Sequence, residues 1–65
     1  MNDFSTTLKK LINDADMTQK DFAKKSGVTE AAISRYVNGT RMPNMEALLR
    51  MKTALGCKWE DIMGE

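Results

Sequence analysis

Short segments of helical periodicity, each with its own start and stop signals, divide this chain of 65 residues. Three segments end at a glycine, the residue type that most often terminates an α-helix: Gly27, Gly39 and Gly56. Three begin after a residue type that caps helix N-termini: Thr18, Thr29 and Asn44. No stretch of useful length alternates apolar and polar residues, so a sheet is not expected. These start and stop signals predict an all-α fold, a compact bundle of five short helices.

The expected helix bounds follow from these signals and from the apolar spacing. The helices cover residues 4–14, residues 18–26, the segment from Thr29 to Asn38, the segment from Asn44 to Gly56, and residues 58–63. Asp21 completes a capping-box pattern with Thr18, three residues before it. The apolar side chains expected to face the core are Leu8, Leu11, Ile12, Ala15, Phe22, Ala23, Ile33, Tyr36, Val37, Leu48, Leu49, Met51, Leu55, Trp59 and Ile62.

Length and composition restrict the class of protein. Sixty-five residues are expected to form a single domain over residues 1–65, near the lower limit for a core without covalent or metal staples. A single cysteine cannot form an internal disulfide, and a chain without histidine offers no familiar metal-ligand set. No signal-peptide segment and no apolar run of membrane-spanning length is present. We therefore expect a cytoplasmic protein that uses no metal, cofactor, small-molecule ligand or membrane.

Catalysis is not expected either. The sequence has no histidine, no phosphate-binding glycine loop and no carboxylate pair in an evident cleft. A chain this short also has little volume in which to enclose a substrate. The sequence therefore predicts a binding protein and not an enzyme.

The distribution of charge is more informative than the net charge of +1. Residues 17–42 carry five basic and two acidic side chains, whereas the rest of the chain carries five basic and seven acidic ones. The excess of positive charge thus lies around the second and third expected helices, which is suggestive of an anionic partner.

The third expected helix, within "VTEAAISRYVNG" (residues 28–39), has two unlike sides. Its apolar residues fall on one side: Ile33, Tyr36 and Val37. At about 100° per residue, the opposite side spans an arc of about 140° and holds Glu30, Ala31, Ser34, Arg35 and Asn38. A short helix with a buried side, a polar side and a basic helix before it suits the major groove of DNA.

The stretch "TQKDFAKKSGVTEAAISRYVNGTRMPNMEALLRMKTALG", residues 18–56, resembles the helix-turn-helix core of phage-repressor and Cro-type (XRE-like) regulators. The matching features stand at fixed offsets: Gln19 at a helix start, Ala23 and Gly27 four and eight residues later, core residues Val28, Ile33 and Tyr36, and "NG" before a loop ending in proline. Physical reasons support two of them, because helices that cross closely require a small residue such as Ala23, and Gly27 permits a tight turn. The flanking helices match more loosely.

The resemblance implies a lambda-repressor-like fold and a function. The protein would be a transcriptional regulator, a repressor, that binds a pseudo-palindromic operator in double-stranded DNA as a homodimer in a prokaryotic or phage-encoded setting, at the nucleoid. Base edges would be read by Glu30, Ala31 and Arg35, with Thr29 and Ser34 nearby. Backbone phosphates would be bound by Gln19, Lys20, Asn38, Thr40 and Arg41. Pairing of two chains would use the last helices, with Trp59, Ile62 or Met63 at their edge, and would be weak without DNA.

Two departures from the family pattern carry expectations of their own. Basic residues often stand in the family where this chain has Thr40 and Met42, so we expect modest affinity and a shallow salt dependence. Related repressors often carry an arginine and a glutamate, as a partly buried ion pair, where this chain has Ile12 and Val37. Replacing such a pair as a unit is often neutral or stabilising, and we expect Ile12 to contact Val37.

A second class of function remains open: a helix-turn-helix module that binds a protein, as an antitoxin or a regulatory adaptor does. Such a module should carry apolar anchors on the outward side of residues 30–38, and that side is polar.

Among the other residues, Met17, Met51, Tyr36 and Cys57 are expected in the core, whereas Met42, Met45 and Met63 are left unassigned.

Overall fold

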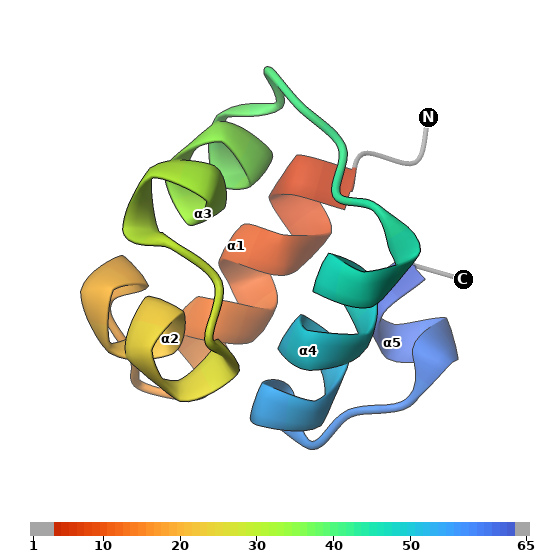
Figure 1. Cartoon of the computed structure of the whole chain (residues 1–65). Helices are drawn as coiled ribbons and strands as arrows, with labels where there is room; N and C mark the ends of the chain where they lie inside the picture. Colours follow the sequence, from red (N-terminus) through yellow and green to blue (C-terminus); the bar gives the residue numbers. More distant parts are fainter. Residues whose placement is uncertain (1–3, 64–65) are drawn as a thin grey trace.

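The computed structural model describes residues 4–63, which form five helices and no strand (Figure 1). Their bounds are α1 Phe4–Asp14, α2 Gln19–Ser26, α3 Glu30–Asn38, α4 Met45–Leu55 and α5 Trp59–Met63. The expected all-α, five-helix, lambda-repressor-like fold is confirmed, and each helix end lies within about a residue of its prediction.

Local hydrogen bonds explain why the helices begin where the sequence predicts. The Thr18 hydroxyl accepts from the Asp21 amide at 3.0 Å, and the Thr18 amide donates to the Asp21 carboxylate at 3.4 Å, which completes the capping box. Thr29 and Asn44 accept from the amides of Ala32 and Ala47 at 3.2 and 2.8 Å. These caps satisfy amides that the first turn leaves without a helical partner.

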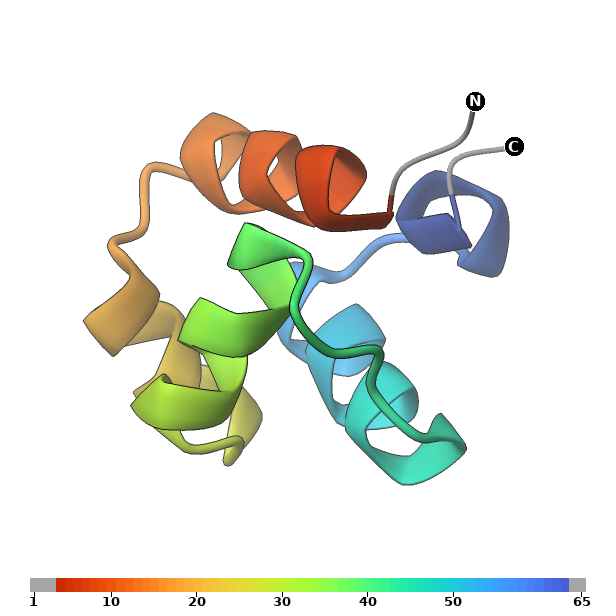
Figure 2. The ribbon, with the colours of Figure 1, turned by 90° about the horizontal axis from the view of Figure 1, so that it is seen from above.

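The core receives one fully buried side chain from each helix: Leu8, Phe22, Ile33, Met51 and Ile62. Burial of a large apolar side chain stabilises a fold by about 1.5–3 kcal/mol. Because the helices are too short to be stable alone, this shared core holds them in place. Figure 2 shows the result from above: α1 lies across α3, and α5 lies at the end of α1 away from α2.

Three side chains that were expected to face inward do not. Ala15, which follows the last residue of α1, is exposed. Leu49 is 50% exposed and Trp59 is 41% exposed. The core side of α4 is set by Leu48, Met51 and Ala54, three residues apart, and Leu49 lies about 100° from that side. The short α5 buries only Ile62, and the ring of Trp59 instead lies 5.3 Å from the ammonium of Lys52.

The remaining residues expected in the core are buried or partly buried, whereas the unassigned methionines are exposed. Met51 and Tyr36 are buried, whereas Met17 and Cys57 are partly buried and pack against the core. Burial raises the pKa of the Cys57 thiol, and the nearby Asp61 carboxylate raises it further, so the protonated thiol is favoured. The unassigned methionines are exposed: Met42, Met45 and Met63. Within residues 4–63, no helix has the length and apolarity needed to cross a membrane.

Candidate nucleic-acid interface

Helices α2 and α3 are joined by a tight turn over residues 27–29. Gly27 has a φ of 77° and donates its amide to the Ala23 carbonyl at 3.0 Å. A β-carbon at this position would also lie 3.2 Å from Nη1 of Arg50. The buried Ser26 hydroxyl accepts from the Val28 amide at 3.3 Å, which fixes the next residue of the turn. The left-handed backbone angle therefore favours glycine here, and a β-carbon would in addition require the Arg50 guanidinium to shift slightly.

The turn holds α3 against the rest of the fold. Ala23 is buried on α2, and α3 packs against both α1 and α2 (Figures 1 and 2). Ile33, Tyr36 and Val37 are buried on the inner side of α3. A helix fixed on two sides leaves its third side in a defined orientation, and this arrangement is the helix-turn-helix motif.

The outward side of α3 carries the residues that the sequence assigned to base reading. Thr29, Glu30, Ala31 and Arg35 are exposed, and Ser34 is partly exposed. Thr29 uses its hydroxyl oxygen as the N-cap acceptor and keeps its hydroxyl proton for another partner. Ser34 accepts from the side-chain amide of Asn38 at 3.4 Å. The fold thus places these side chains on one accessible face.

The residues assigned to phosphates lie at both ends of this face. Gln19 and Lys20 are exposed in the first turn of α2, and Asn38, Thr40 and Arg41 are exposed at and after the end of α3. The Thr40 amide and hydroxyl both donate to the Arg35 carbonyl, at 3.0 and 3.2 Å. The Thr40 hydroxyl proton is therefore engaged in ending α3, a role that the sequence did not predict.

The charged side chains of this face have no ionic partner within residues 4–63. In that part of the chain, an ion pair joins Arg50 to Glu46 at 3.1 Å on α4, away from this face. Lys20, Arg35 and Arg41 consequently present uncompensated positive charge, while Glu30 lies in the first turn of α3, where the helix dipole favours an acidic side chain. The described residues hold no cluster of three or more potential metal ligands.

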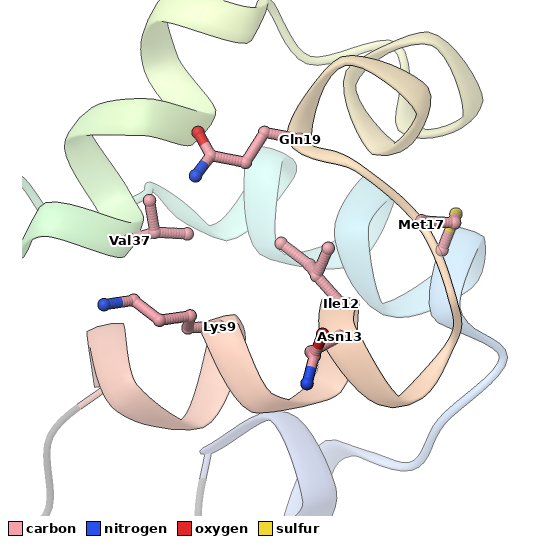
Figure 3. A pocket seen from close by; sticks show the side chains of 6 residues that line it. All are labelled: Lys9, Ile12, Asn13, Met17, Gln19 and Val37. Carbon is pink, nitrogen blue, oxygen red and sulfur yellow. The ribbon is translucent and has the colours of Figure 1, made fainter.

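A pocket of about 210 Å³ opens between α1, the start of α2 and α3. Figure 3 shows the six side chains that line it: Lys9, Ile12, Asn13, Met17, Gln19 and Val37. Ile12 and Val37, for which a contact was expected, line it from α1 and α3 and are both buried. Sequence reasoning did not single out Lys9. Its spacing gave a signal, because residues three apart on a helix are neighbours and Lys9 precedes Ile12 by three.

The comparison with protein families agrees with this geometry. A family model described as helix-turn-helix matches residues 8–62, which include the turn, α2, α3 and α4 in full. No curated protein and no solved structure matches the chain. The matching family is one of DNA-binding regulatory domains and not of enzymes. The chain therefore belongs to the helix-turn-helix family of the XRE type, the family of phage-repressor and Cro-type transcription regulators.

Proposed function

We propose that this protein is a repressor that binds a pseudo-palindromic operator in double-stranded DNA by inserting α3 into the major groove. The observation that carries the proposal is the division of α3 into a buried apolar side and an exposed polar side, fixed by α1 and α2. An α-helix fits the major groove, where each base pair has a distinct pattern of donors and acceptors. Binding to DNA would place the protein at the nucleoid, in the cytoplasm.

Base reading is assigned to Glu30, Ala31 and Arg35, with Thr29 and Ser34 beside them. Phosphate binding is assigned to Gln19, Lys20, Asn38, Thr40 and Arg41. The side chains of the second group flank α3 at both ends, so they can fix its orientation while the first group contacts base edges. For Thr40, the engaged hydroxyl leaves its oxygen as an acceptor only, and we assign it chiefly to positioning the loop that holds Arg41.

Two copies are proposed to bind together, because one domain reads too few base pairs for selectivity in a genome. Trp59 and Met63 are exposed and lie four residues apart on α5, which places them on the same side of the helix. Ile62, which was also considered for pairing, is fully buried and cannot be a surface contact. The proposed contact is therefore small, and pairing is expected to be weak without DNA.

The alternative, a module that binds another protein, has one observation in its favour. Met42, Met45 and Leu49 are exposed apolar side chains near and on α4. They lie outside the outward side of α3, which has no large apolar anchor. Since anchors of that kind dominate the energy of most protein interfaces, the polar side of α3 favours DNA.

Sedimentation of the protein with and without operator tests the proposal. The operator would first be obtained by selecting bound sequences from a random pool of duplex DNA. We expect a monomer alone and two protein chains per operator, on half-sites about one helical turn apart. A selection that yields no preferred sequence would favour the protein-binding module, and one chain on an asymmetric site would contradict the homodimer.

Arg41→Ala should weaken binding to operator and to random DNA equally and lower the slope of log K against log salt by about 0.9. The physical reason is that phosphates are the same in every sequence, so a phosphate contact gives affinity without selectivity. Fluorescence anisotropy over a salt series measures both quantities. Lys25→Ala is the matched control, because Lys25 is exposed and lines a hollow with α4, away from α3. A changed base preference in Arg41→Ala would contradict the assignment.

A further inference from the structure

The pocket between α1 and α3 holds a basic side chain to which the proposed function gives no role. Lys9 and Gln19 line this pocket from two different helices, α1 and the first turn of α2. In Figure 3 both side chains extend toward Val37 on α3, with Lys9 on one side of Val37 and Gln19 on the other. A primary ammonium and a carboxamide thus approach the same part of α3 from opposite sides.

The chemistry of the pocket leaves the ammonium of Lys9 available. Its two deepest members, Ile12 and Val37, are apolar and 4% and 3% exposed. The remaining polar lining residues, Asn13 and Gln19, are neutral, and the side chain of Lys9 makes no ion pair or hydrogen bond within residues 4–63. An exposed cation without an internal counter-charge is a suitable partner for an anion that approaches from outside.

The location decides which anion that is. Gln19 begins α2, where the backbone amides of a helix start favour a phosphate group. Val37 directly precedes Asn38, which is assigned to phosphate binding at the end of α3. Lys9 therefore lies between the two ends of the proposed phosphate-binding surface. Lys10, its neighbour in sequence, lines a different hollow with Thr6, Lys9 and Asn13 on α1.

We propose that Lys9 is a further phosphate-binding residue, which together with Gln19 clamps one backbone phosphate of DNA over the apolar pocket of Ile12 and Val37. The inference rests on the proposed function and extends the interface from α2 and α3 to α1. In this arrangement Gln19 supplies a directed hydrogen bond, and Lys9 supplies the charge. The absence of a carboxylate from this pocket is what leaves that charge to the DNA.

Lys9→Ala and Lys10→Ala form a matched pair for the first test. Each removes one positive charge from an exposed position of α1, so neither should alter the fold, which a thermal melt would check. Lys9→Ala should lower the slope of log K against log salt by about 0.9. The ratio of the affinity of the unchanged protein to that of the variant should therefore fall about 3.5-fold between 50 and 200 mM salt. Lys10→Ala and Lys9→Arg should both show the same salt slope as the unchanged protein.

The second test locates the phosphate. Each backbone phosphate of the operator is replaced in turn by neutral methylphosphonate, and binding is measured. Replacement at one position should weaken binding by the unchanged protein and have no effect on binding by the Lys9→Ala protein. The same position should have a reduced effect on Gln19→Ala. Equal slopes for Lys9→Ala and Lys10→Ala, or a methylphosphonate profile unchanged by Lys9→Ala, would overturn the clamp while leaving the proposed function intact. An unchanged protein that fails to bind DNA would overturn both.

Discussion

Val37→Glu is expected to lower the free energy of unfolding by about 2–4 kcal/mol. Val37 is 3% exposed on the inner side of α3 and shares its pocket with the equally apolar Ile12. A carboxylate at this position loses most of its hydration, and the ammonium of Lys9 at the edge of the pocket supplies only partial compensation. Urea denaturation followed by circular dichroism measures the loss, which should grow when Lys9→Ala is added.

Two controls separate this effect from a general intolerance of α3. Ala31→Glu adds the same carboxylate to the exposed side of the same helix and should change the stability by no more than about 0.5 kcal/mol. Ile12→Arg combined with Val37→Glu should recover most of the loss, because a buried charge with a partner costs much less than one without. If Val37→Glu unfolds at the same urea concentration as the unchanged protein, the expected contact between Ile12 and Val37 does not exist.

The parts of the fold that the sequence predicted are those fixed by local chemistry. Thr18, Thr29 and Asn44 each bond an amide three residues further along, so a few neighbouring letters determine where a helix begins. The orientation of α3 was also predictable, since its apolar residues occupy one continuous side over nine residues. The candidate site residues on α3 were those on the side opposite its apolar residues.

The features that the sequence did not predict depend on contacts between distant segments. Trp59 was expected inside, yet a helix of five residues has too little length for its apolar spacing to define a side. Leu49 was misplaced because α4 has apolar residues on two adjoining sides, and only packing selects one. The proposed role of Lys9 depends on a pocket that forms only when α1, α2 and α3 pack together.

The same distinction explains the limits of the site assignments. From the sequence, the hydroxyl of Thr40 was expected to be available to a phosphate. In the structure it donates its proton to the Arg35 carbonyl near the end of α3. That bond is between residues five apart and exists only because the chain turns back at Gly39, whose φ is 77°. The turn leaves the side chain of Arg35 unaffected, since Thr40 bonds the Arg35 backbone carbonyl and not its guanidinium.

Arg35→Ala is expected to cost about 1–3 kcal/mol of binding free energy on the operator and little on random DNA. Arg35 is exposed in the last turn of α3 and has no ionic partner within residues 4–63, so its guanidinium is free to donate two hydrogen bonds to O6 and N7 of a guanine. Ala31, one turn earlier, offers only a methyl group, whose suitable partner is the methyl of thymine. Glu30 can accept from a cytosine amine and, through repulsion from phosphates, would mainly exclude other bases.

The competing interpretation is that Arg35 binds only a phosphate. Selecting operators with the Arg35→Ala protein distinguishes the two, because loss of a base contact should relax the preference at one guanine in each half-site. Arg35→Lys should bind random DNA as the unchanged protein does but should not restore the full guanine preference, since an ammonium lacks the planar fork. Equal losses on operator and random DNA, with the guanine preference retained, would assign Arg35 to the backbone. Sequence reading by α3 would then have to depend on Glu30, Ala31 and their neighbours alone.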